Sequence, residues 1–503
     1  MKKSIKLNYI FNAGYQIFTI IVPLITAPYI SRALGADGVG TYSYTFAIVS
    51  YFTLASTLGA GAFGNRQIAI LQDNPIERSI EFWNVFIFRS SSTLIVTAFY
   101  LLYVIFIAQD KQIALLQSLY LLAVLIDTSW FLQGMELFKT ISIRNFIFKI
   151  INVICIFAFV KSREDLPIYI LCLAGITVIS NLAVLPYTAK HIVKVPIKKL
   201  KPLKNTKQIL QLFFPTIACN LYAIIDKSMI GWFSTSVENG YYEQADKIIN
   251  MSLMLIIALS GVMLPRIANE VSKGNNDSVK MHMEKSCHLV WILGFPFTFG
   301  LIAISDFFVP IFFGEGYDKV KILLPVMSCL FILKGLNNTI GYQYLIATGK
   351  QNIYNRIILI GGAVNITANL LLIPKLYSMG ATIGSIISEA IICILLISYV
   401  SNKKLLEIKP IFASSVKCFA SSLVMFAMLL LIKHFYADKI ANLFYLIVTI
   451  IIAAIIYAVG LLELKDVLVA DVLNSFLDKF RLKKSNNCLL YTSPSPRDGL
   501  LSR

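Results

Sequence analysis

The chain contains a succession of long apolar runs separated by short charged segments, and this feature constrains its fold more than any motif does. Each run has about 17–25 mainly apolar residues, the length of a helix that crosses a hydrocarbon core about 30 Å thick. Charged residues make up only 14% of the 503 residues, whereas a soluble domain has about 25%. We therefore expect an all-α membrane protein.

Fourteen membrane spans are expected along the chain. They cover approximately residues 8–30, 40–62, 83–108, 113–133, 145–160, 167–188, 209–232, 243–264, 287–305, 322–346, 357–374, 379–400, 411–432 and 441–462. The longest internal connections are 189–208 and 265–286, so no sizeable soluble domain is inserted. An even number of spans places both termini on the same side of the membrane.

Lysine and arginine are distributed unevenly between the two sides. Segments on the side of the termini carry 29 of these residues, and the opposite loops carry nine. Because basic residues accumulate in cytoplasmic loops, both termini are expected in the cytoplasm. The formal net charge of +18 is then explained by basic loops facing anionic lipid, with no nucleic-acid partner. The most basic segment, 189–208, is either a topology anchor or a contact site for anionic lipid or a pyrophosphate headgroup.

The chain resembles itself at an offset near 200 residues. Gly40-Thr41-Tyr42 opens the second span and Gly240-Tyr241-Tyr242 opens the eighth, and Arg66 and Arg266 follow these two spans. Since six spans separate the copies, both have the same orientation, as in the parallel repeats of some transporters. The expected organisation is an N-terminal lobe over 1–207, a C-terminal lobe over 208–400, and a third part over 401–484 with spans 13–14 and an amphipathic cytoplasmic helix. The last two spans either cover a groove at the lobe interface or only anchor the protein.

The sequence has no motif typical of catalysis or of metal binding. It lacks the GxxxxGK[ST] loop that holds nucleotide phosphate, and it lacks HExxH or any other metal-ligand spacing. The four His residues form no cluster, and the eight Cys residues form no CxxC pair. We therefore expect a transporter and not an enzyme, with no cofactor and no metal.

Ionisable residues in or beside the spans are the candidates for function. A charge at the bilayer centre costs about 2.5–3.5 kcal/mol on the insertion scale, so it tends to face a wet cavity or a partner. The basic candidates for a substrate-binding cavity between the lobes are Arg89, Lys334, Arg66, Arg266, Lys227 and Lys247. The acidic candidates, for ion coupling or for structural ion pairs, are Asp226, Asp246, Asp127 and Glu389. Arg89 and Lys334 have no obvious partner nearby in the sequence. A cationic cavity suits an anionic substrate such as a pyrophosphate group, whose oxygens arginine can bind in pairs.

Four segments are distinctive in combination. They are 28–40 (PYISRALGADGVG), 127–134 (DTSWFLQG), Asp226 through Tyr242, and Leu264-Pro265-Arg266. Together they resemble the polysaccharide-repeat (Wzx-type) flippases of the multidrug/oligosaccharidyl-lipid/polysaccharide exporter superfamily. The resemblance extends over about residues 1–485. It implies a MATE-like fold of fourteen helices in two lobes that alternates between inward-open and outward-open states.

The resemblance also implies an activity. It is the translocation of undecaprenyl-pyrophosphate-linked oligosaccharide units across the bacterial plasma (inner) membrane, for capsule or O-antigen synthesis. The implied partners are the lipid-linked substrate, membrane lipids, and polysaccharide polymerase and chain-length proteins. On the same fold, a multidrug/cation antiporter is disfavoured by the excess of basic residues in the spans. A lipid II flippase ranks lower because Ala33, and not an acid, follows Arg32. A polymerase or ligase is disfavoured because the external loops are short.

The last residues differ in character from the rest. Residues 488–503 (CLLYTSPSPRDGLLSR) resemble the translation of a transposon mosaic-end sequencing adapter. We expect this segment to be an artefact without function.

Overall fold

The computed structural model describes residues 5–436, 443–466 and 468–470, and this part of the chain is helical without strands. Twelve of the described helical segments are long and apolar enough to cross a membrane. The protein is therefore a multi-pass, all-α membrane protein. The segment 488–503 and most of the amphipathic helix expected over 463–484 lie outside the described residues.

The first half of the chain, here called the N-lobe, contains ten α-helices and begins with a bent helix. Gly35 has a positive φ of 65° inside α1, and this left-handed conformation divides the helix into the first two expected spans. A tight turn at Leu58 and Gly59 then leads into α2. The helices are α1 (Ile5–Thr57), α2 (Ala60–Ile70), α3 (Pro75–Phe106), α4 (Lys111–Gln117), α5 (Leu119–Ile126), α6 (Ser129–Gly134), α7 (Phe138–Phe159), α8 (Leu166–Ile170), α9 (Ile176–Leu182) and α10 (Leu185–Ala189).

Two expected spans of the N-lobe are interrupted helices. The span expected over 113–133 consists of α4, α5 and α6, and Asp127 ends α5 with an extended backbone (ψ 118°). The span expected over 167–188 contains one turn of π-helix, η2 (Leu171–Gly175), between α8 and α9. Irregular backbone at membrane depth is tolerated where it is buried in protein or lines a cavity. We therefore expect both interruptions to be buried within the N-lobe or to line a cavity there.

The second half, here called the C-lobe, is made of longer helices. Its helices are α11 (Thr206–Phe233), α12 (Ser236–Ser272), α13 (Asn276–Phe313), α14 (Val320–Asn337), the π-helix η4 (Asn338–Ile346), α15 (Gln351–Leu376) and α16 (Ser378–Asn402). Thr235 caps α12, because its hydroxyl accepts a hydrogen bond from the backbone N–H of Glu238 at 3.3 Å. One continuous buried core joins these helices, whereas the N-lobe core is divided into three smaller clusters.

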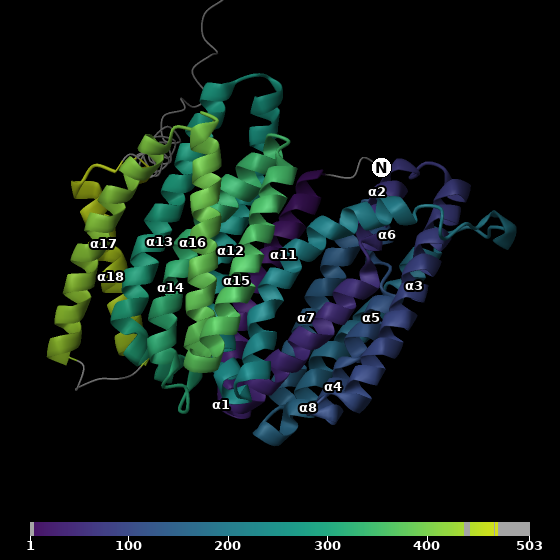
Figure 1. Ribbon diagram of the computed structural model, residues 1–503, viewed down its shortest axis with the longest axis horizontal. Helices are drawn as coiled ribbons and strands as arrows, with labels where there is room; N and C mark the ends of the chain where they lie inside the picture. The colour runs from purple at the N-terminus through teal and green to yellow at the C-terminus, as the bar shows by residue number, and fades with distance from the viewer. Residues whose placement is uncertain (1–4, 437–442, 467, 471–503) are drawn as a thin grey trace, which may run out of the picture.

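The last two helices, α17 (Ile408–Tyr436) and α18 (Leu443–Glu463), pack on the outer side of the C-lobe. The indole of Trp291 in α13 donates to the carbonyl of Ile411, and the hydroxyl of Tyr457 donates to the carbonyl of Ile292. Figure 1 shows α17 and α18 at the edge of the molecule farthest from α3. This position favours an anchoring role over the expectation that they cover a groove between the lobes.

Each of the fourteen expected spans overlaps a helix of the structure in the expected order. The twelve candidate spans count the two parts of α1 as one, and α11 is not among them. The number fourteen therefore stays a prediction, as do the domain boundaries at residues 207 and 400. The helical membrane fold itself is confirmed.

Candidate functional site: the lobe interface and the polar interior

The two lobes meet where the internal repeat places its paired glycines. Gly40 in α1 lies against Gly240 in α12, and a Cβ atom built on Gly40 would lie 1.6 Å from the carbonyl oxygen of Ser236. A Cβ on Gly240 would lie 1.9 Å from the carbonyl oxygen of Ala36. Only glycine permits this close approach of two backbones. The residues that the repeat relates by symmetry therefore form one contact.

Among the described side chains, five hydrogen bonds join the lobes around this glycine contact. We call the glycine contact together with these bonds the gate. The hydroxyl of Ser43 donates to Glu243 at 2.9 Å, and Tyr51 bonds Ser228 at 2.7 Å. The remaining three bonds are Ser236 to Asp37, Tyr317 to the carbonyl of Ser31 at 3.3 Å, and Arg32 to the carbonyl of Ile311 at 2.5 Å. All of them lie on the stretch of α1 between residues 31 and 51.

The arginines that follow the two glycines lie far from the gate. Each arginine, Arg66 or Arg266, comes 26 residues after its glycine. Along α12 this spacing corresponds to about 39 Å at 1.5 Å per residue. Both arginines are exposed, and neither forms an ion pair with another residue of the described chain. Figure 1 shows α2, which carries Arg66, at the end of the N-lobe opposite to α4 and α8.

Lys227 and Lys247, which the sequence predicted for a cationic cavity, lie beside the gate and form ion pairs with acidic side chains. The ammonium of Lys227 lies 2.7 Å from Glu243 and 3.1 Å from Asp246, and Lys247 lies 3.6 Å from Glu243. Two lysines thus meet two acids, and the cluster has no net charge. Sequence reasoning missed Glu243, although its position four residues before Lys247 on one helix face was a signal for an ion pair.

Asp226 does not pair with its neighbour Lys227. Its carboxylate is 7% exposed and accepts hydrogen bonds from Tyr242 at 2.6 Å, from Asn369 at 2.6 Å and from Ser385. These neutral donors come from α12, α15 and α16. Asn365 extends the network by contacting Asn369 at 3.2 Å. Asp226 is therefore a buried carboxylate with no cationic partner in the described part of the chain.

Arg89 has a partner that the sequence did not reveal. Its guanidinium lies 3.1 Å from the carboxylate of Asp127 and donates to the Asp127 carbonyl at 2.9 Å. The two residues are 38 positions apart, so Arg89 has no partner nearby in the sequence, but the fold supplies one. The other Asp127 oxygen accepts from the backbone N–H of Ser129 at 2.9 Å. The pair joins α3 to the break between α5 and α6.

The interior of the N-lobe contains two adjoining hollows. One, of about 200 Å³, is lined by Asp127, Tyr120 and Asn181 among others. The other, of about 250 Å³, shares Tyr120 and Asn181 and is lined further by Arg144 and Lys149. Amide side chains of Asn145, Asn152 and Asn181 also line the second hollow. It is therefore a polar hollow inside a lobe that is otherwise apolar.

Arg144 and Lys149 are the site residues that sequence reasoning missed. Neither residue is among the basic candidates that the sequence predicted for a substrate-binding cavity. A signal was present, because Asn145, Lys149 and Asn152 recur at spacings of four and three residues and thus share one face of α7. The guanidinium of Arg144 donates to Asn181 at 3.3 Å and to Asn145 at 2.6 Å.

The two remaining candidates lie in the C-lobe. The carboxylate of Glu389 accepts from the amide of Asn337 at 2.6 Å. Lys334 lies half-buried on α14 and forms no ion pair with another described residue. Within the described residues, His288, Cys418 and Asp466 are the one group with metal-ligand geometry. A hydrogen bond of 2.8 Å already joins His288 to Asp466.

Comparisons with known proteins agree with this architecture. The family model described as "Polysaccharide biosynthesis protein" matches residues 5–270. A putative O-antigen transporter of Escherichia coli (strain K12) is 23% identical over 411 residues, which are 80% of this chain and 99% of that protein. A probable low-salt glycan biosynthesis flippase of Haloferax volcanii is 25% identical over 204 residues, covering 41% of this chain and 43% of that protein.

Solved transporters share the fold. The lipid II flippase MurJ in an inward closed conformation superimposes with a TM-score of 0.71 at 17% identity, covering 92% of this chain and 100% of that one. A multidrug resistance transporter of the MATE family in an inward-facing conformation has a TM-score of 0.58 at 11% identity, covering 81% and 94%. These likenesses establish the MATE-like fold, and the family match covers more than half of the sequence. The chain belongs to the polysaccharide biosynthesis protein family.

Proposed function

We propose that this protein is a flippase that moves an undecaprenyl-pyrophosphate-linked oligosaccharide across the bacterial inner membrane. The relatives whose names state an activity include an O-antigen transporter and a glycan biosynthesis flippase, and the lipid II flippase MurJ shares the fold. We place both termini in the cytoplasm, on the basis of the lysine and arginine distribution. The gate at Gly40 and Gly240 then closes the outer side, and the exposed Arg66 and Arg266 lie on the cytoplasmic side.

The observation that carries the proposal is the placement of basic side chains without acidic partners. Arg66, Arg266, Lys334 and Lys149 form no ion pair with described residues, whereas Lys227 and Lys247 next to the gate do. An anionic pyrophosphate could therefore bind to these four basic side chains, which lie away from the gate. Phosphate oxygens bind such groups through charge-assisted hydrogen bonds. The lobes would release the cargo outside once the gate opens and the opposite ends close.

Asp226 is the acid that we propose for energy coupling. Asp127 and Asp246 are already paired with basic side chains, but Asp226 is buried among neutral donors. A buried intramembrane carboxylate that no basic side chain neutralises tends to mark an ion pathway, so we assign the coupling ion to Asp226. The Asp226→Asn variant is expected to lose transport while its protein level stays normal. Asp318→Asn is the matched control, because the Asp318 side chain is 81% exposed.

The substrate assignment is tested by complementation. A bacterial strain that lacks its own repeat-unit flippase is supplied with this chain and assayed for surface polysaccharide. The variants Lys149→Gln and Lys334→Gln are expected to reduce export about tenfold or more, since one hydrogen bond to a charged group is worth about 1.5–3 kcal/mol. Lys111→Gln, an exposed lysine at the start of α4, is the control. Full activity of both variants would contradict the proposal that these basic side chains bind the pyrophosphate of the cargo.

Parallel assays separate the alternatives on the same fold. Rescue of a strain depleted of its lipid II flippase would assign lipid II as the cargo. A change in drug susceptibility without surface polysaccharide would assign multidrug antiport. Neither result is expected, because the family match and the basic residues both favour an anionic polysaccharide precursor.

A further inference from the structure

The lysine-rich connection between the lobes is a fixed strap and not a loose loop. This strap, residues 190–207, is bound to α3 at several points. Arg78 donates to the carbonyl of His191 at 2.7 Å, and the Ser79 hydroxyl accepts from the backbone N–H of Val193 at 3.0 Å. The side-chain oxygen of Asn84 accepts from the backbone N–H of Lys201 at 2.7 Å. The amide of Asn205 donates to Glu81 at 2.7 Å.

The outer surface of the strap combines positive charge with exposed apolar side chains. All seven of its lysines are exposed: Lys190, Lys194, Lys198, Lys199, Lys201, Lys204 and Lys207. None of them forms an ion pair with another described residue. Between the lysines, Ile197 is 84% exposed and Leu203 is 75% exposed. Such a combination is typical of segments that lie in the headgroup region of an anionic membrane.

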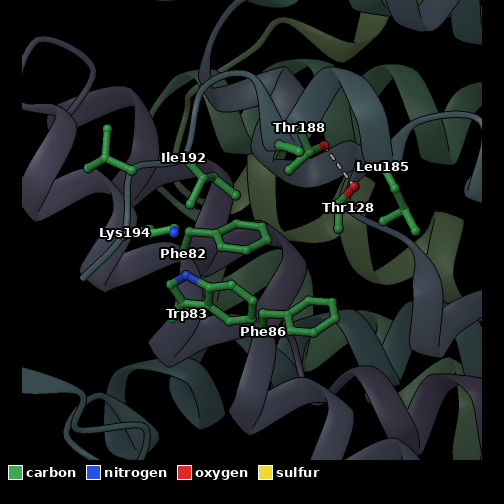
Figure 2. Close-up of a pocket in the computed structure, with 10 residues that line it drawn as sticks. Phe82, Trp83, Phe86, Thr128, Leu185, Thr188, Ile192 and Lys194 are labelled. Carbon is green, nitrogen blue, oxygen red and sulfur yellow. Dashed lines mark hydrogen bonds between the residues drawn. The ribbon is translucent and has the colours of Figure 1, made fainter. Parts of the chain in front are cut away.

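An apolar pocket opens beside the strap, and Figure 2 shows its residues. Its volume is about 360 Å³, within the range of about 300–1,000 Å³ for small-molecule sites. Its walls are mainly apolar, formed by Phe82, Trp83 and Phe86 of α3 and by Leu185 and Ile192. Lys194 of the strap lines the same pocket and is labelled in Figure 2. The pocket thus has a cation next to an aromatic wall.

The pocket lies at the beginning of the span expected over 83–108, since Phe82, Trp83 and Phe86 line it. Residues 82–86 lie seven to eleven positions after the start of α3 at Pro75, which corresponds to about 10–16 Å along the helix. Trp83 is 36% exposed, as expected of a tryptophan at the membrane interface. Thr128 and Thr188 also line the pocket, and their hydroxyl oxygens lie 2.9 Å apart in a hydrogen bond. These two hydroxyls are therefore already paired where an apolar chain would contact them.

We propose that the strap and this pocket bind an anionic phospholipid of the adjacent leaflet, with its phosphate on Lys194 and an acyl chain between Trp83 and Ile192. The charge of Lys194 selects the headgroup, and the aromatic wall holds the chain. This lipid site is distinct from the polar hollow of Arg144 and Lys149, so it does not depend on the proposed cargo. The bound lipid stabilises the strap where it connects the two lobes.

Fluorescence quenching tests the site directly. The full-length protein is placed in nanodiscs that contain either brominated phosphatidylglycerol or brominated phosphatidylcholine. The difference between wild type and Trp83→Phe isolates the signal of Trp83 from that of the other three tryptophans. The Trp83 signal is expected to be quenched more strongly by brominated phosphatidylglycerol. Equal quenching by the two lipids would overturn the proposal.

Variants of the strap and pocket supply an independent measurement. Retention of phosphatidylglycerol by the purified protein is measured by native mass spectrometry. Lys194→Gln is expected to weaken retention about fivefold, the effect of one basic residue near an anionic surface. Ala189→Phe, which fills the pocket from an exposed position, is expected to weaken it as well. Lys204→Gln, on the same strap but outside the pocket, is the control.

Two results would contradict the proposal. If Lys194→Gln retains as much phosphatidylglycerol as Lys204→Gln, the pocket has no role in lipid binding. If undecaprenyl pyrophosphate displaces phosphatidylglycerol from the wild type at equal concentration, the site belongs to the cargo lipid. A retention loss confined to Lys194→Gln and Ala189→Phe, without such displacement, supports an anionic phospholipid.

Discussion

Replacing Gly240 with alanine is expected to open the gate between the lobes. The added Cβ would lie 1.9 Å from the carbonyl oxygen of Ala36, where real Cβ contacts stay above 3.0 Å. The backbones must therefore separate by about 1 Å or more. Gly261→Ala lies on the same helix α12 with nothing within 4 Å of its Cβ, so it is the matched control. Both variants gain the same helix propensity of about 1 kcal/mol, and the difference between them reports the gate alone.

The magnitude follows from the hydrogen bonds that surround the glycines. Separation would break the bonds of Ser43 to Glu243, Tyr51 to Ser228 and Tyr317 to Ser31. At about 1 kcal/mol net for each bond, the closed state loses about 3 kcal/mol. This changes the ratio of closed to open molecules about 150-fold. A protein that is mainly closed would become mainly open on the outer side.

The assay measures the distance between probes at Lys111 and Asp318, which flank the gate on the two lobes. Noncanonical amino acids carry the probes, because the chain has eight native cysteines. Gly240→Ala should shift the distance distribution to longer values and reduce polysaccharide export. If it matches Gly261→Ala in both measurements, the glycine contact does not control the gate.

Three further predictions concern other contacts. Arg89→Gln should lower the unfolding temperature of the purified protein, since breaking a buried ion pair costs about 3–5 kcal/mol; the double variant with Asp127→Asn should recover part of the loss, and a purely additive result would argue against the pair. Asn84→Ala should speed tryptic cleavage of the strap, because a buried hydrogen bond worth about 1 kcal/mol is lost; an unchanged rate would show that other contacts hold the strap. The hydrogen bond and charge of Lys280, 2.8 Å away, hold the pKa of Glu407 below its ordinary value. The ion pair of Lys280 and Glu407 therefore stabilises the folded protein at neutral pH, and this stabilisation is lost as the pH falls through the lowered pKa of Glu407. Relative to the intrinsic exchange rate at each pH, the protection of the amides between α16 and α17 should fall on acidification in the wild type but not in Glu407→Gln.

The sequence alone determined the class of the fold because the bilayer imposes a simple rule. Every backbone polar group in hydrocarbon must be satisfied within the segment, so a long apolar run is a helix whatever surrounds it. The order of the helices could therefore be predicted. The symmetry of Gly40 and Gly240 was also visible, because repeats preserve residues that the packing requires. The family followed from motifs that lie within the matched residues 5–270.

Only the tertiary structure decided which charges are compensated. Arg89 forms an ion pair with Asp127, which lies 38 positions away in the sequence. Lys227 pairs with Glu243 and not with its neighbour Asp226. Asp226 is hydrogen-bonded to neutral donors instead. The physical reason is that helix packing sets these distances and neighbours in sequence point to different sides of a helix. For the same reason the sequence did not single out Lys149 in the span expected over 145–160, whereas packing places it in a polar hollow. Local rules determine the spans, but the partners of a buried charge are chosen by the fold.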